Sequence, residues 1–148
     1  MPERIGKFEI VRKLGQGGMG EVYLAVDPGL GREVALKTMA PALTHSEGGR
    51  ERFLREARAA GTLNHPNLVT IYEFGEDAGV LFLVMELLPG QDLTACLKDH
   101  SLTPSEALEV MAQVCDGLGF AHGKGIIHRN KAARRKSLEK GKEKAGAQ

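Results

Sequence analysis

A run of glycines near the N-terminus has the composition of a phosphate-binding loop. Gly15, Gly17, Gly18 and Gly20 are four glycines within six positions. Glycine has no Cβ, so the backbone of such a run can approach a ligand closely, and a cluster of bare N–H groups can bind phosphate oxygens. Taken alone, the pattern fits a flexible hairpin turn equally well, because a single Gly-x-Gly-x-x-Gly spacing is weakly specific.

Strands are predicted on both sides of the glycines, because their side chains alternate in a period of two. A strand, a glycine turn and a second strand form a hairpin. This excludes a dinucleotide-binding turn, in which a helix follows the glycines. The alternating sets are Phe8, Ile10 and Arg12 with Glu9, Val11 and Lys13 before the turn, and Val22, Leu24 and Val26 with Glu21, Tyr23 and Ala25 after it.

Lys37 lies in a third predicted strand, on the same face as apolar side chains such as Ala35. An ammonium group in that setting is costly unless it is paired. Glu56 borders the apolar stripe of a helix predicted over residues 50–63, and it is the candidate partner. A merely structural pairing of Glu56 with Arg52 or Lys37 is the alternative.

These motifs together resemble the N-terminal lobe of a protein kinase, most closely the bacterial Ser/Thr kinases of the eukaryotic type. The motifs are Gly15-x-Gly17-x-x-Gly20-x-Val22, Val34-Ala35-Leu36-Lys37 and Glu56, and the resemblance covers roughly residues 5–129. It implies that the glycine loop covers the phosphates of ATP, and that the strand lysine contacts them and pairs with the helix glutamate.

The resemblance also implies where the adenine lies. Met85 is the expected gatekeeper, and the backbone C=O of Glu86 and N–H of Leu88 in the hinge are expected to bind the adenine edge. Asp92 either meets the ribose or caps the helix that follows, and both readings stay open. The expected ATP-binding residues are Leu14, Gly15, Gly17, Gly18, Gly20, Val22, Ala35, Lys37, Glu56, Met85, Glu86, Leu88 and Asp92.

The expected fold class is α+β. A kinase N-lobe (residues 1–85) with a five-stranded antiparallel sheet and one helix is followed by a hinge (86–90) and by two helices of a partial C-lobe (91–129). The remaining predicted segments are a polar loop over 41–49, strands over 68–74 and 80–85 joined by a hairpin loop over 75–79, and helices over 93–98 and 104–121.

The resemblance breaks down in the catalytic loop. The position of the general base holds Asn130, whose amide cannot take a proton at neutral pH. The metal-binding asparagine of the family aligns with Arg135, and the sequence contains no Asp-Phe-Gly. We therefore expect no intact catalytic residue, no metal ligand, and Mg²⁺ bound only weakly, if at all.

Residues 130–148 are rich in Lys, Arg, Ala and Gly, and we expect a disordered basic tail there. The abrupt change of composition inside a motif suggests a truncated or frame-shifted gene product. A net charge of +1 argues against general binding to nucleic acid or membranes. Only two cysteines, no signal segment and no membrane span favour a cytoplasmic protein.

Three functions are compatible with these features. The first is the ATP-binding portion of a Ser/Thr protein kinase, inactive in phosphoryl transfer as this chain. The second is an active kinase, if missing parts complete it. The third is a non-catalytic interaction module, in which the apolar face of helix 104–121 binds a protein partner or a second copy. That face comprises Ala107, Met111, Val114, Leu118 and Ala121.

Overall fold

The computed structural model describes residues 1–126, which form parts of two compact units. The first unit contains Met1–Asn64 and Val69–Gly90, and the second contains His65–Leu68 and the chain from Gln91. Asn130, Arg135 and the predicted basic tail lie outside the described residues.

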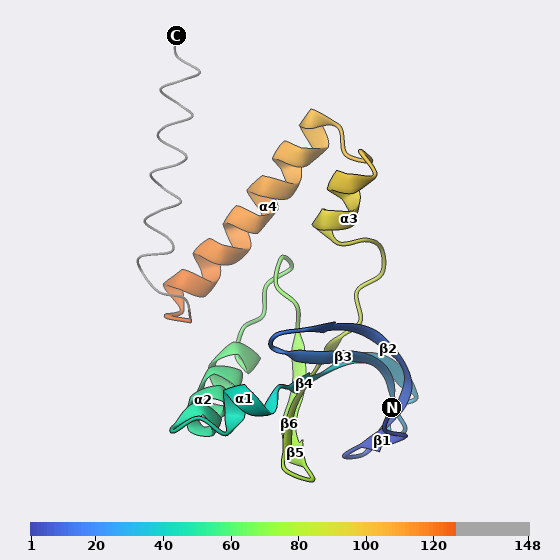
Figure 1. Ribbon diagram of the computed structural model, residues 1–148. Helices are drawn as coiled ribbons and strands as arrows, with labels where there is room; N and C mark the ends of the chain where they lie inside the picture. The colour runs from blue at the N-terminus through green and yellow to red at the C-terminus, as the bar shows by residue number, and fades with distance from the viewer. Residues whose placement is uncertain (127–148) are drawn as a thin grey trace. The chain divides into compact units, whose positions relative to one another are not determined.

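The first unit is built on a six-stranded antiparallel sheet with the strand order β1-β2-β3-β4-β6-β5 (Figure 1). The predicted α+β kinase-lobe class is confirmed, but the sheet has one strand more than the five predicted. The additional strand is β1, only two residues long. The strands are β1 (Arg4–Ile5), β2 (Phe8–Gly17), β3 (Gly20–Asp27), β4 (Arg32–Met39), β5 (Ile71–Asp77) and β6 (Val80–Glu86).

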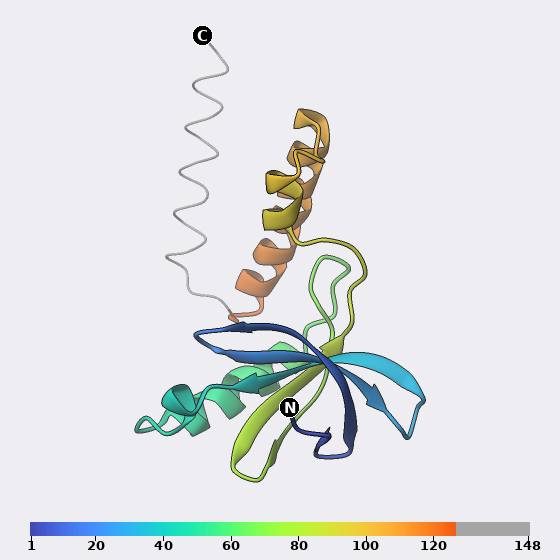
Figure 2. The same ribbon diagram turned by 45° about the vertical axis from the view of Figure 1, so that its right-hand side comes forward.

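The sheet is strongly twisted, so the β2–β3 and β5–β6 hairpins run in clearly different directions (Figure 2). β5 and β6 are joined by Ala78 and Gly79 alone, which both have positive φ, 47° and 78°. A two-residue turn with both φ values positive matches the natural twist of a hairpin. The predicted loop over 75–79 is therefore too long, because Gly75, Glu76 and Asp77 belong to β5.

The hydrophobic core lies on one face of this sheet. Rows of alternating side chains from five strands meet there, and the rings of Phe8 and Phe82 pack edge to face with their centroids 6.2 Å apart. Gly75 packs directly against Phe82, and a Cβ at that position would lie 2.8 Å from the ring. The core residues are Ile5, Phe8, Tyr23, Ala25, Val34, Leu36, Phe82 and Val84.

In the first unit, two helices lie between β4 and β5 along the chain. The polar loop predicted over 41–49 is partly wrong, because α1 (Pro41–Thr44) begins there with proline in its first turn. α2 (Gly49–Gly61) contacts β5, and Arg50 in its first turn forms an ion pair with Glu76 of that strand. α2 ends two residues earlier than the predicted helix, since Thr62 is its C-cap.

The second unit contains the helices α3 (Leu93–Lys98) and α4 (Pro104–Gly123). α4 begins with the capping box that the sequence predicts: Thr103 Oγ1 accepts from Glu106 N at 3.2 Å, and Glu106 Oε2 accepts from Thr103 N at 2.7 Å. Asn67 holds the 65–68 segment to α4 by donating to the Gln113 carbonyl at 3.0 Å. Within residues 1–126, no helix is long and apolar enough to cross a membrane.

The core face should dominate the stability of the first unit. Leu36 is fully buried, with 0% of its surface exposed, and Leu36→Ala should lower the free energy of unfolding by about 2–5 kcal/mol. Leu30 is 67% exposed, so the matched change Leu30→Ala should alter it by about 0.5 kcal/mol or less. Urea titration followed by circular dichroism measures both changes, and equal midpoints for the two variants would contradict this core assignment.

Candidate functional site

The candidate site lies on the sheet face opposite the core. In the antiparallel register, Val22 of β3 stands opposite Lys37 of β4, and Lys37 stands opposite Leu83 of β6. Two residues further along the same face, Ala35 stands opposite Met85. Paired residues of neighbouring strands share a face, so the register gathers Val22, Lys37, Ala35 and Met85, as the sequence predicts.

The four glycines of the β2–β3 hairpin differ in what the fold requires of them. Gly20 has φ +137°, and a Cβ there would overlap the carbonyl oxygen of Thr38, so the fold demands glycine. Gly15, Gly17 and Gly18 have ordinary φ values, and a Cβ at any of them would meet nothing within 4 Å. Packing does not explain these three glycines, whereas the close approach of a ligand's phosphate to their backbone would.

The predicted ion pair between Lys37 and Glu56 is not formed. Lys37 is half-buried, Glu56 is exposed on α2, and within the part of the chain described here no carboxylate lies within 4.0 Å of the Lys37 ammonium group. The buried side of α2 is formed by Ala57, with Phe53 and Ala60 half-buried on the same stripe, whereas Glu56 at the border of this stripe is exposed. The positions of both residues are those predicted, but their contact is not.

The end of β6 presents backbone groups of the predicted hinge. Glu86 is fixed by two bonds to Thr70: its N–H donates to the Thr70 carbonyl at 3.0 Å, and its Oε1 accepts from Thr70 N at 2.7 Å. Leu88 is exposed, and among the described residues nothing accepts from its N–H. That N–H is therefore available to a ligand.

Two further predicted site residues have local structural roles. Asp92 caps α3, and its Oδ1 accepts from Ala95 N at 2.7 Å. Its predicted contact with a ribose stays a prediction. Leu14 lies in an irregularity of the β2–β3 ladder, between Lys13, which pairs with Tyr23, and Gly15, which pairs with Val22. Leu14 therefore has no partner residue in β3 and is exposed.

A polar cluster on the opposite face of the same hairpin was not expected from the sequence. Glu21 accepts from Lys13 Nζ on one carboxylate oxygen and from the Tyr23 hydroxyl on the other, and Lys13 also donates to Gln16 Oε1 at 2.6 Å. The hydrogen bond from Lys13, and next that from Tyr23, lowers the pKa of the Glu21 carboxyl. Burial, reinforced by Glu21, raises the pKa of Tyr23 to about 12, so its hydroxyl stays protonated and donates.

This cluster was not predicted from the sequence, because strict alternation of side chains was assumed along β2. Irregularities between Ile10 and Arg12, and again between Lys13 and Gly15, each add one residue to β2 relative to β3. Such bulges turn the following side chains to the other face. Arg12 therefore does not share the face of Ile10 as predicted, and Lys13 does instead. The sequence feature that could have predicted this cluster is the opposite charge of Lys13 and Glu21, which lie on the two sides of the hairpin turn.

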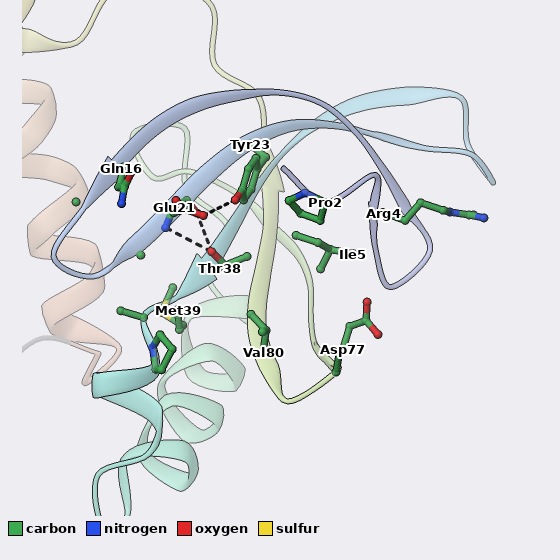
Figure 3. Close-up of a pocket in the computed structure, with 15 residues that line it drawn as sticks. Pro2, Arg4, Ile5, Gln16, Glu21, Tyr23, Thr38, Met39, Asp77 and Val80 are labelled. Carbon is green, nitrogen blue, oxygen red and sulfur yellow. Dashed lines mark hydrogen bonds between the residues drawn. The ribbon is translucent and has the colours of Figure 1, made fainter.

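A cavity of about 500 Å³ lies on this core-side face, beside the Glu21 cluster (Figure 3). The Glu21, Tyr23 and Thr38 side chains lie together in its wall, and Thr38 Oγ1 bonds to both backbone groups of Glu21 at 3.4 Å. Glu21, Tyr23 and Thr38 alternate with Val22 and Lys37 along their strands, and the cavity also reaches Gly17 and Gly20 of the hairpin tip. Residues 1–126 contain no group of three or more His, Cys, Asp or Glu side chains arranged to hold a metal ion.

Comparison with known proteins assigns the family. The model of the family described as "Protein kinase domain" matches residues 8–130, most of the chain. The chain belongs to the protein kinase family. It is 44% identical over 125 residues to the serine/threonine-protein kinase pkn2 of Myxococcus xanthus and 40% identical over 126 residues to the serine/threonine-protein kinase PrkC of Bacillus subtilis.

The alignment with each of these two kinases covers only part of the relative's length. It includes 84% of this chain in both cases, but 15% of the length of pkn2 and 19% of that of PrkC. The crystal structure of the PknI kinase domain of Mycobacterium tuberculosis superposes with a TM-score of 0.78 at 34% identity, over 87% of this chain and 53% of that one. This chain is thus similar to about half of a kinase domain, and the family in general uses ATP and Mg²⁺.

The glycines of the kinase hairpin should respond to substitution in opposite ways. Gly20→Ala should lower the free energy of unfolding by at least about 2 kcal/mol, because it adds backbone strain and a clash with the Thr38 carbonyl. Gly17→Ala should change it by about 0.5 kcal/mol or less, since open space surrounds that position. Thermal unfolding of both variants measures the difference, and similar melting temperatures would refute the distinction between the two glycines.

Proposed function

We propose that the first unit binds ATP on the sheet face that carries Lys37. The observation that carries this proposal is the register of β3, β4 and β6, which brings Val22, Ala35 and Met85 onto the face of the lysine. Small apolar side chains form a surface on which a flat adenine ring can lie. The kinase family uses the corresponding motif positions for the same ligand.

The hinge supplies directional contacts for the adenine edge in this proposal. The Glu86 carbonyl accepts from the adenine amino group, and the Leu88 N–H donates to a ring nitrogen. Leu88 is exposed, and its N–H has no acceptor among the described residues. This supports the assignment, because an amide that makes no hydrogen bond within the fold can donate to a ligand in place of water. Fixing Glu86 through Thr70 limits the freedom that binding must remove.

The phosphates are assigned to the space between the glycine hairpin and Lys37. The open surroundings of Gly15, Gly17 and Gly18 support close approach of phosphate oxygens to their N–H groups. Lys37 is half-buried, and no carboxylate of residues 1–126 lies within 4.0 Å of its ammonium group, so phosphate would supply the counter-charge. Glu56 is then expected to approach Lys37 only when α2 shifts, since it is exposed in this structure.

We further infer that this chain by itself does not transfer phosphate. The family resemblance places Asn130 at the position of the general base and Arg135 at that of a Mg²⁺ ligand. An amide cannot accept the proton of a substrate hydroxyl, and losing a general base costs typically about 10²–10⁴-fold in rate. A cation at the magnesium position would also weaken Mg²⁺ binding. The cytoplasmic location stays a prediction.

ATP should raise the melting temperature of the chain. A ligand at 100 times its dissociation constant stabilises the folded state by about 2.7 kcal/mol. Lys37→Met should abolish this shift, because the variant keeps the apolar stem and removes the only cation proposed to hold phosphate. Lys98→Met, in the exposed last turn of α3, is the matched control and should keep the shift. Differential scanning fluorimetry with millimolar ATP measures all three proteins.

Two results would contradict the proposal in different ways. No shift for the unmodified chain at millimolar ATP would reject nucleotide binding and favour an interaction module. An unchanged shift for Lys37→Met would reject the role of the lysine alone. Separately, transfer of labelled phosphate from ATP to a generic basic protein by the purified chain would reject the inferred inactivity.

A second candidate function is self-association through α4. The observation that favours it is a row of large apolar side chains on this helix that are at least 38% exposed. Burying one such side chain is favourable by roughly 1.5–3 kcal/mol relative to leaving it in water. Contact with the same face of a second copy would therefore stabilise a dimer. The row comprises Leu108, Met111, Val114 and Leu118.

Sedimentation equilibrium tests this candidate. The unmodified chain should show a dimer whose population rises with concentration, and Leu108→Glu should shift the equilibrium to the monomer by about tenfold or more, because it places a charge in the apolar contact. Leu43→Glu, at an exposed leucine of α1, should leave the equilibrium unchanged. A monomer at every concentration would eliminate self-association through this helix.

A further inference from the structure

The tip of the glycine-rich hairpin has almost no side chains to hold it. Gly17 and Gly20 close the β2–β3 ladder, and Gly18 and Met19 form the turn, with Met19 65% exposed. The backbone of the turn meets β4 where Gly20 pairs with Met39 and where Ala40 N donates to the Met19 carbonyl at 3.0 Å. The position of the tip therefore depends on these backbone contacts and on the side-chain contacts just behind it.

Glu21 lies immediately behind the tip and joins three strands. Its carboxylate accepts from Lys13 of β2 and from Tyr23 of β3, and its backbone N–H and C=O both bond to the Thr38 hydroxyl of β4. Lys13 extends the connection to Gln16, the last residue before Gly17. We call Lys13, Glu21 and Tyr23 the hairpin brace.

The two irregularities in β2 create the brace. Each adds a residue to that strand, and together they place Lys13 opposite Tyr23 and Gln16 opposite Glu21. Without the first, Lys13 would lie on the same face as Lys37. Bulges are known to re-aim side chains beside functional sites, at the cost of ladder hydrogen bonds. Here the re-aimed side chain meets an acidic partner of opposite charge.

The brace lies on the face away from the proposed nucleotide. Glu21 precedes Val22, and neighbouring residues in a strand point to opposite faces, so the Glu21 side chain lies on the core side while Val22 shares a face with Lys37. Neither Glu21 nor Tyr23 is therefore positioned to touch ATP on the Lys37 side. Any effect of these side chains on ATP must act through the position of the hairpin.

We propose that Glu21 is a positioning residue, and that the brace holds the N–H groups of Gly17 and Gly18 at the height at which they meet the phosphates of ATP. This inference rests on the proposed function of the hairpin. A loop that is already ordered loses less conformational freedom on binding, so the brace increases affinity without adding a contact. Supporting groups of this kind fix a site to within fractions of an ångström.

The role predicts a selective loss. Glu21→Gln keeps the shape of the side chain and removes its charge, which weakens the bond to Lys13. ATP affinity should fall about tenfold, the factor that corresponds to one charge-assisted hydrogen bond. Adenosine affinity should stay unchanged, because adenosine has no phosphates and is proposed to depend on the hinge and the apolar face. A merely structural role would lower both affinities together.

Isothermal titration calorimetry of the 148-residue chain with ATP and with adenosine is the test. Glu33→Gln is the matched control, since Glu33 is an exposed β4 glutamate, and it should leave both affinities unchanged. Tyr23→Phe removes one hydroxyl group and should lower ATP affinity alone, by about threefold, the effect of one neutral hydrogen bond. This variant keeps the test available if Glu21→Gln does not fold. Lys13→Met alone should also lower ATP affinity, and the double variant Lys13→Met, Glu21→Gln should lose less than the sum of the two single losses, because both changes act on the Lys13–Glu21 bond.

The outcomes separate this inference from the proposed function. If the unmodified chain binds no ATP, the proposed function is wrong and the positioning role falls with it. If the unmodified chain binds ATP, but Glu21→Gln and Tyr23→Phe keep the ATP-to-adenosine affinity ratio of the unmodified chain, only the brace is refuted. Additive losses in the double variant would likewise reject the Lys13–Glu21 interaction as the cause.

Discussion

The antiparallel register of β3, β4 and β6 is the constraint on which the rest of the first unit depends. It aligns Tyr23 with Leu36 and Leu36 with Val84 on one face, and Val22 with Lys37 and Lys37 with Leu83 on the other. A slip by one residue would exchange the two faces and bury an ammonium group in place of a leucine. The core and the candidate site are therefore specified by the same backbone pairing.

The glycine hairpin is an extension of this sheet that carries little packing of its own. Besides the backbone pairing of Gly20 with Met39, its position depends on polar contacts across three strands, which meet at Glu21. Those contacts are made possible by irregularities in β2 that give up ladder pairing. Gly17 and Gly18 at the tip of the hairpin are surrounded by open space, whereas the residues behind the tip are held by hydrogen bonds. The glycine backbone can therefore be accessible to a ligand while the hairpin stays ordered.

Much of this arrangement could be predicted from the sequence. The glycine spacing, the Val34–Lys37 run and the apolar stripe around Ala57 were enough for the fold class, and the alternation in β3 gave the correct faces for Val22 and Tyr23. β1 was missed because two residues are too few for a periodic pattern. α1 was missed because a four-residue helix carries little signal beyond its proline.

The details of the site were harder to foresee, since they depend on register and on helix facing. Strict alternation cannot account for an added residue, so the predicted side-chain directions of Arg12 and Lys13 were reversed. Glu56 was correctly placed beside an apolar stripe, but the stripe alone could not fix its distance from Lys37, because that distance depends on how α2 packs against β5. Local pattern predicts faces, whereas pairing across elements requires tertiary contacts.

The different surroundings of the hairpin glycines have an evolutionary consequence. Gly20 is required by the approach of the β4 backbone, whereas Gly15, Gly17 and Gly18 are surrounded by open space. In a lineage released from selection for phosphate contacts, mutations at the latter three would be tolerated and would accumulate first. The surviving glycine would then mark ancestry and foldability alone, so its retention in a divergent descendant would say nothing about nucleotide use.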